Sequence, residues 1–206
     1  MSALVVIAKE CIPGRVKTRL HPPFSLEAAA AIAAASLAET LDAVREVPVR
    51  RRILYLQGRT VGIPHAGFEV IPQPDVSLAE RLAAIFDLLD EPTLLIGMDT
   101  PQVRAADLRW PDRADAIVGI AADGGFWALG MSRPRGDVIR GVPMSQPDTG
   151  ARQLAALARA GMSVELLRTL RDVDLADDAR AVAAQLPGSG FARVVATASA
   201  ESQVRA

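Results

Sequence analysis

The most distinctive chemistry of the sequence lies directly after the apolar run Leu4–Ala8. A short loop there contains a Pro-Gly pair and four cations: Lys9, Arg15, Lys17 and Arg19. Guanidinium groups, a lysine ammonium and the backbone amides around Gly14 can together hold a polyphosphate. The loop has neither the glycine–lysine spacing of a Walker loop nor the glycine fingerprint of dinucleotide-binding proteins. The alternative interpretation is a solvated basic loop without a ligand.

A carboxylate stands at the end of another apolar run. Asp99 follows Thr93–Gly97 and precedes Pro101, which fixes a turn. Mg²⁺ takes one or two protein carboxylates and completes its coordination with phosphate and water, so Asp99 is well placed to bind such a cation. Alternatively, Asp99 caps a short helix after Pro101. The residues alone leave both roles open.

The segment Asp123-Gly124-Gly125 is followed by Phe126 and Trp127. The simplest interpretation of Asp-Gly-Gly is a turn. Two glycines between an aspartate and Trp127 also permit close approach of the backbone to a ligand, with the indole as an aromatic wall. The segment is therefore a candidate pocket for a substrate.

Asp172 and Asp174 form a further acidic pair late in the sequence. In an extended segment, residues two apart point to the same side, so both carboxylates could contact a metal ion. The competing interpretation, slightly favoured locally, is that Asp174 caps the helix that follows.

The elements that must position these segments follow from the hydrophobic pattern. Apolar runs predict buried strands at Leu4–Ala8, Ile53–Leu56, Thr93–Gly97 and Ala116–Ala121. Intervening stretches predict helices over Ser25–Val47, after Ser77, over Thr149–Ala160 and from Asp174 to about Leu186. Gly124-Gly125 leaves no room for a crossover helix before the apolar run Phe126–Met131, so this strand is predicted to be antiparallel. The predicted class is α/β, with three layers and a mixed but mainly parallel sheet flanked by helices, and ligands of such sheets bind at the carboxyl ends of the strands.

Composition restricts the class of protein further. The 206 residues are 50% hydrophobic and 23% charged, with a net charge of −1. This balance is typical of a globular domain and argues against a uniformly basic nucleic-acid-binding protein. The single cysteine, Cys11, cannot form an intramolecular disulfide and fits a reducing cytoplasm. No apolar run approaches the ~18 residues that a membrane span needs. We expect one cytoplasmic domain over residues 1–187 and an edge strand or loose tail over residues 188–206. An apolar sheet edge or helix face could support a homodimer.

Taken in order, these segments resemble the motifs of a bacterial family of glycosyltransferase-A-like proteins, often named radical-SAM/selenodomain-associated transferases. The matching segments are Ala8–Leu20, Gly97–Pro101, Asp123–Trp127 and Asp172–Asp174. The resemblance implies the fold of the nucleotide-diphospho-sugar transferase superfamily, in which a divalent cation bridges the phosphates of a nucleotide. It also implies roles for single residues. Asp99 becomes the leading metal ligand with Asp174 or Asp172 as the second, Arg15, Lys17 and Arg19 become phosphate contacts, and Asp123, Gly124 and Gly125 line the acceptor or sugar pocket.

The resemblance implies a metal-dependent transferase that uses a nucleotide-activated donor and Mg²⁺ or Mn²⁺. The first hypothesis is glycosyl transfer from a nucleotide sugar to a small-molecule acceptor. A cation on Asp99 would neutralise the diphosphate leaving group, Arg15 and Lys17 would stabilise its developing charge, and Asp123 would orient or deprotonate the acceptor. The second hypothesis is nucleotidyl transfer from an NTP to a phosphorylated small molecule with release of pyrophosphate, similar to 2-phospho-L-lactate guanylyltransferase. The third is a nucleotide-binding protein without catalysis.

Overall fold

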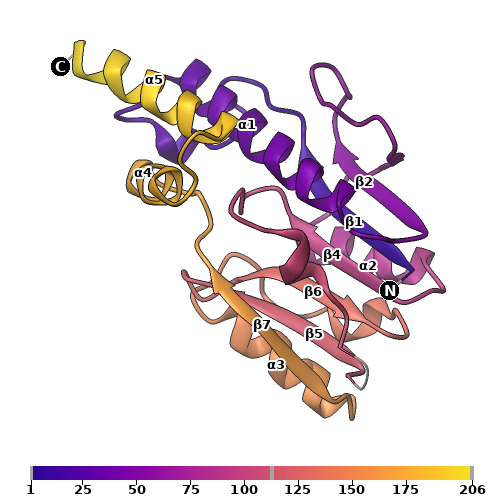
Figure 1. The fold of residues 1–206 in the computed structure, drawn as a ribbon. Coiled ribbons are helices and arrows are strands. Elements are labelled where there is room, and N and C mark those ends of the chain that lie inside the picture. Colours follow the sequence, from indigo (N-terminus) through magenta and orange to yellow (C-terminus); the bar gives the residue numbers. More distant parts are fainter. Residues whose placement is uncertain (1, 112–113, 205–206) are drawn as a thin grey trace.

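The computed structural model describes residues 2–111 and 114–204, and a mixed β-sheet forms its centre (Figure 1). The seven strands have the order β3-β2-β1-β4-β6-β5-β7. Their bounds are β1 Ala3–Lys9, β2 Arg51–Gln57, β3 Glu69–Pro72, β4 Thr93–Gly97, β5 Ala116–Ala121, β6 Phe126–Met131 and β7 Val164–Leu170. Four neighbouring pairs are parallel, and β6 is antiparallel to both β4 and β5. The predicted α/β class is therefore confirmed, as is the antiparallel strand after the glycine pair.

Helices cover both faces of this sheet (Figure 1). They are α1 (Leu26–Arg45), α2 (Leu78–Leu88), α3 (Thr149–Arg159), α4 (Ala176–Gln185) and α5 (Gly190–Val204), with the 3-10 turns η1 (Thr18–Leu20), η2 (Ala105–Leu108) and η3 (Gly136–Val138). On one face, Leu37 of α1 belongs to the same buried cluster as Val6 of β1. On the other face, Phe86 of α2 joins the cluster that contains Val5. Adjacent strand residues point to opposite faces, so the continuous apolar run of β1 is explained by burial on both sides.

A third apolar cluster lies between α1, α4 and α5 and corrects the prediction for the end of the chain. Residues 188–206 were expected to form an edge strand or loose tail, which is wrong for residues 190–204, because they form α5 and pack along α1 (Figure 1). Phe191, Val195 and Ala198 are buried and recur at helical spacing, which gives α5 an apolar stripe. Residues 205–206 of the predicted tail lie outside the described part.

Two strands, β3 and β7, escape the sequence analysis because they lie at the two edges of the sheet. Most residues of both are exposed or half-buried, so neither shows a continuous apolar run. Pro72, which lacks an amide donor, ends β3. Edge strands of this kind acquire their structure by pairing with a central strand rather than from their own pattern.

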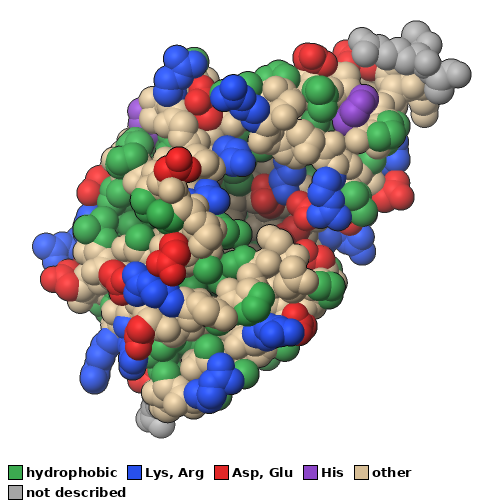
Figure 2. Space-filling model, turned by 180° about the vertical axis from the view of Figure 1, so that it is seen from behind, with side chains coloured by type: hydrophobic (Ala, Val, Ile, Leu, Met, Phe, Trp, Pro, Cys, Tyr) green, Lys and Arg blue, Asp and Glu red, His purple; other side chains and the backbone are tan. Residues whose placement is uncertain are grey.

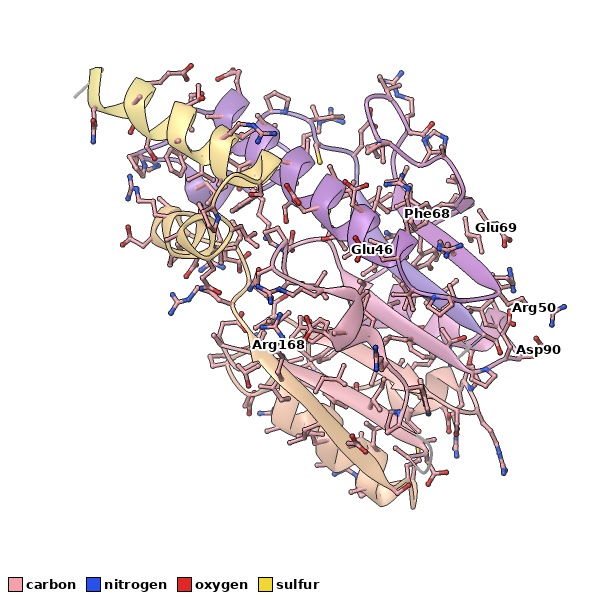
Figure 3. All side chains as sticks on the ribbon, in the orientation of Figure 1. Glu46, Arg50, Phe68, Glu69, Asp90 and Arg168 are labelled. Carbon is pink, nitrogen blue, oxygen red and sulfur yellow. The ribbon has the colours of Figure 1, made fainter. Side chains whose placement is uncertain are left out.

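The amino-terminal side of the strands is plainly a solvated surface. Glu46, Arg50 and Asp90 are exposed there, in the connections that lead into β2 and β4 (Figure 3). Arg168 of β7, also labelled in Figure 3, donates to Asp107 of η2 and to the Gln102 carbonyl and thereby ties the β4–β5 connection to the edge strand. Among the described helices, none has the length and apolarity that crossing a membrane requires.

Candidate functional site

A cleft of about 620 Å³ opens at the carboxyl ends of β1, β2 and β4. Figure 2 shows a hollow with acidic and basic side chains around it on the face turned away in Figure 1. Because β6 runs in the opposite direction, its first residue, Phe126, lies at the same side of the sheet, and Asp172 and Asp174 follow β7 there. The volume falls within the range of small-molecule sites, roughly 300–1,000 Å³.

Most of the predicted site residues line this cleft. They are Lys9, Arg19, Asp99, Asp123, Gly125, Trp127, Asp172 and Asp174. Four predicted residues are not among its lining residues: Gly14, Arg15, Lys17 and Gly124. Lys17 contacts two lining residues, Asp99 and Asp174. Gly14 and Arg15 are exposed on the loop after β1. Gly124 has φ +89°, and a Cβ there would lie 1.8 Å from the Pro147 carbonyl oxygen, so this glycine brings two loops together instead of facing a ligand.

Lys17 lies at the centre of the charged groups. Its ammonium is 2.6 Å from Asp174 Oδ1 and 2.9 Å from Asp99 Oδ2, and its side chain is 11% exposed. Its backbone is left-handed, with φ 46°, which is uncommon for a residue with a side chain. Burial alone lowers the pKa of Lys17, but the charges of Asp99 and Asp174 outweigh burial and raise the pKa above its ordinary value. Lys17 is therefore a cation throughout the neutral pH range.

Three carboxylates, Asp99, Asp172 and Asp174, gather around this ammonium. The Oδ1 atoms of Asp99 and Asp172 are buried without a hydrogen-bond partner. Burial, followed by the charges of Asp99 and Asp123, raises the pKa of Asp172 to about 7, and Lys17 offsets only part of this rise. Unpartnered carboxylate oxygens beside further carboxylates are the donors that a hard divalent cation prefers.

The three carboxylates suit a divalent cation chemically, although the Lys17 ammonium lies between two of them in this structure. Within residues 2–111 and 114–204, no three histidine, cysteine or acidic side chains surround a common metal position. The Lys17 ammonium lies between Asp99 and Asp174 and contacts both. Asp99 and Asp174, with Asp172 beside them, are thus the residues that could hold Mg²⁺ or Mn²⁺ if Lys17 moves.

The capping roles considered for the aspartates do not agree with the structure. Leu175 is the N-cap of α4, and its amide donates to Asp178, so Asp174 does not cap that helix. Arg104 is the N-cap of η2, the short helix after Pro101, so Asp99 does not cap that helix. Asp123 does form the predicted turn, since its Oδ1 accepts a hydrogen bond of 2.9 Å from the Gly125 amide. The turn also lines the cleft, so the two interpretations of this segment are compatible.

A network of amides and one guanidinium, not found from the sequence, lines the β2–β3 end of the cleft. Gln73 donates to the Ala8 and Tyr55 carbonyls at 2.8 and 2.7 Å and accepts from Arg81 at 3.0 Å. Arg81 also donates to Gln57 at 2.9 Å, and its Nε is buried without a partner. Gln57 directly follows the predicted strand Ile53–Leu56 and could have been found by that position, whereas Gln73 follows β3, which has no clear pattern.

The segment Met144–Pro147 and Thr149 also line the cleft and also escape the sequence analysis. Ser145 is left-handed, with φ 58°. Thr149 Oγ1 accepts from the Gln146 amide and donates to the Pro143 carbonyl, which fixes this loop at the start of α3. The available signal was the position of a polar Ser-Gln-Pro-Asp segment directly before a predicted helix.

The strand order, together with a charged cleft at the strand ends, defines an α/β fold of the nucleotide-diphospho-sugar transferase type. The chain belongs to the family described as "Uncharacterized protein conserved in bacteria (DUF2064)", which it matches over residues 40–146, just over half of its length. The family resemblance and fold type predicted from the motifs are thereby confirmed. No curated protein matches the chain.

Three solved structures illustrate the similarity. A candidate nucleotide-diphospho-sugar transferase from Desulfovibrio desulfuricans G20 has a TM-score of 0.83 and 21% identity, with 98% of each chain covered. Rv0371c from Mycobacterium tuberculosis H37Rv in complex with manganese has a TM-score of 0.52 and 23% identity over 88% of this chain and 98% of that one. CMP:2-keto-3-deoxy-manno-octonic acid synthetase complexed with CTP has a TM-score of 0.53 and 13% identity over 90% and 99%. At these identities the similarity establishes the fold.

Proposed function

We propose that this protein is a cytoplasmic, single-domain transferase that uses a nucleotide-activated donor, and that it transfers a glycosyl group from a nucleotide-diphospho-sugar to a small-molecule acceptor. The observation that carries the proposal is the cluster of Asp99, Asp172 and Asp174 around Lys17 in a cleft at the strand ends. Open α/β sheets bind their ligands at this position. Related folds include transferases that use nucleotides, one of them in complex with CTP.

The donor lies on the β1–β2–β3 side in this proposal. Gln57 and Gln73 offer amide groups for a nucleobase or ribose, and Arg81 has a buried Nε that lacks a partner. Lys9 and Arg19 supply positive charge for the diphosphate. A divalent cation held by Asp99 and Asp174 would neutralise charge that develops on the leaving diphosphate.

The acceptor side favours glycosyl transfer over transfer to a phosphorylated acceptor. The lining residues around β6 and after β7 are Asp123, Gly125, Phe126, Trp127, Met144–Pro147, Thr149, Asp172 and Asp174, the last of which pairs with Lys17 and Arg19. All belong to the described part of the chain, and none is a lysine or arginine. The cations that line the cleft come from the β1 loop and α2. Since phosphate recognition relies on Arg and Lys, this side suits a hydroxyl-bearing acceptor that Asp123 orients or deprotonates.

Nucleotidyl transfer is the second candidate. The CTP complex among the structures of similar fold supports it, and so does the positive charge of the β1 loop, which suits a triphosphate as well as a diphosphate. Pyrophosphate release from an NTP and an acceptor would favour it. Binding of a nucleotide without any metal-dependent turnover would leave the third alternative, a nucleotide-binding protein.

Thermal denaturation with nucleotide sugars and NTPs, each with and without Mn²⁺, tests the proposal. A ligand at about 100 times its Kd stabilises the folded state by roughly 2.7 kcal/mol. We expect Mn²⁺-dependent stabilisation by one nucleotide sugar. Stabilisation by NTPs but by no nucleotide sugar would refute glycosyl transfer and favour nucleotidyl transfer instead.

The variant Asp99→Asn tests the residue assignment. It keeps the shape of the side chain and removes a charge, so both Mn²⁺ affinity and the Mn²⁺-dependent stabilisation should fall by about tenfold or more. Arg50→Ala, exposed at the amino-terminal side of the sheet, is the matched control and should behave like the parent. Equal binding of metal and nucleotide by Asp99→Asn and the parent would refute the assignment.

A further inference from the structure

The Lys17 ammonium lies where two carboxylates from distant parts of the fold converge. Asp99 follows β4 and Asp174 follows β7, and the ammonium contacts them at 2.9 and 2.6 Å. A lysine ammonium is a compact point charge that does not need the planar geometry of a guanidinium. In this position it offsets part of the negative charge of the two residues best placed to hold a metal.

Lys17 reaches this position from a left-handed backbone. Lys17 has φ 46° and ψ 38° directly before η1, a conformation that residues with a side chain seldom adopt. The neighbouring cation Arg19 contacts the same Asp174 at 3.3 Å but is 70% exposed. One of the two cations is thus enclosed among the carboxylates, while the other lies at the surface.

The carboxylates offer more acceptors than Lys17 satisfies. An ammonium has three donors, and Asp99 Oδ1 and Asp172 Oδ1 remain buried without a partner. A divalent cation such as Mg²⁺ takes about six oxygen ligands, more than the three acceptors that an ammonium can satisfy. Such a cation would use the unpartnered oxygens of Asp99 and Asp172. The ammonium is therefore an incomplete partner for the group that surrounds it.

We propose that Lys17 and a divalent cation compete for Asp99 and Asp174, so that metal binding releases Lys17 from the carboxylates toward the phosphates of a bound donor. The release toward phosphate rests on the proposed function, whereas the competition concerns this chain and the metal alone. In this scheme Lys17 reconciles two roles that exclude each other in one position: it pairs with the ligand carboxylates without metal and contacts phosphate with metal.

The affinity for Mn²⁺ alone, measured by electron paramagnetic resonance, tests the competition. Lys17→Met removes the competing unit charge within 3 Å of both carboxylates and should tighten Mn²⁺ binding by at least about tenfold. Arg19→Met removes a charge that contacts the same Asp174 from the solvent and should change the affinity by less than about twofold. Unchanged or weaker Mn²⁺ binding by folded Lys17→Met overturns the inference.

Nuclear magnetic resonance of the wild-type protein provides a measurement that does not depend on the stability of a variant. The ¹⁵N-labelled ammonium group of Lys17 is shielded by its ion pairs and should give a resonance of its own. The loss of that resonance in Lys17→Met assigns it to Lys17. If Lys17→Met does not fold, Lys17→Arg serves for the same assignment. Saturating Mg²⁺ should abolish or shift this resonance, and an unchanged resonance overturns the inference. If neither the wild type nor the Lys17 variants bind any divalent cation, the metal dependence in the proposed function fails as well. Metal binding without competition leaves the proposed function intact and refutes only the exchange.

Discussion

Replacement of Asp172 by asparagine should stabilise the metal-free protein, and the gain should grow with pH. Asp172 lies among Asp99, Asp123 and Asp174, and its Oδ1 is buried without a partner. Burial, then the neighbouring charges, raise its pKa to about 7 from the ordinary 3.8. Because the folded protein holds this proton more tightly than the unfolded chain, the contribution of Asp172 to stability is greatest below pH 4 and is lost as pH rises from about 4 to about 7.

The size of the effect follows from the shift. A pKa difference of one corresponds to about 1.4 kcal/mol. The rise of the Asp172 pKa from 3.8 to about 7 therefore means that ionised Asp172 destabilises the folded state by about 4 kcal/mol at pH 8. At pH 5 a smaller part of that penalty is present, about 1–2 kcal/mol. The stability difference between Asp172→Asn and the parent should therefore grow by about 2–3 kcal/mol from pH 5 to pH 8.

Urea denaturation at pH 5, 6, 7 and 8, in the presence of a chelator, measures this difference. Asp177→Asn is the matched control, because Asp177 lies on α4 with 92% of its side chain exposed. Its stability difference from the parent should stay within about 0.5 kcal/mol at each pH. Parallel pH dependences for Asp172→Asn and the parent would refute the argument that Asp172 is a strained, buried acid.

Two further predictions concern the elements that position the cleft. Gly124→Ala should lower stability by about 3 kcal/mol, since its Cβ would lie 1.8 Å from the Pro147 carbonyl oxygen and its φ is +89°. Gly62→Ala, with φ +73° and no atom within 4 Å, should lose only about 1 kcal/mol, and equal losses in urea denaturation would contradict the proposed loop contact. Ser25→Ala should lower the stability by about 1 kcal/mol, because Ser25 caps α1 by accepting from the Ala28 amide at 3.1 Å. A melting temperature within 1 °C of the parent would show that this cap contributes little.

The sequence determined the elements whose signals are local. The central strands, such as Val5 and Val6 in β1, are buried on both faces and therefore appear as continuous apolar runs. Ser25 and Ser77 marked two helix starts because a hydroxyl there accepts from an amide three residues later. The positions of Asp99 and Asp123 after predicted strands also indicated one side of the sheet, since parallel strands end together.

The tertiary structure decided the elements that depend on partners. Val164–Leu170 became β7 by pairing with β5, and residues 190–204 became α5 against α1. Neither segment has a pattern strong enough to show its structure without the surface it packs against. The same is true of Gln73, which lines the cleft only because β3 pairs with β2.

The role of Lys17 shows the difference most clearly. The sequence placed this residue in a basic loop and predicted a phosphate contact, which is what its charge and neighbours indicate. The fold brings it to Asp174, 157 residues away, and to Asp99 at the end of another strand. Residue type and spacing determine which groups carry charge, but the charge that each one faces depends on which strands are adjacent. Electrostatic energy varies with distance through space, and only the folded chain sets those distances.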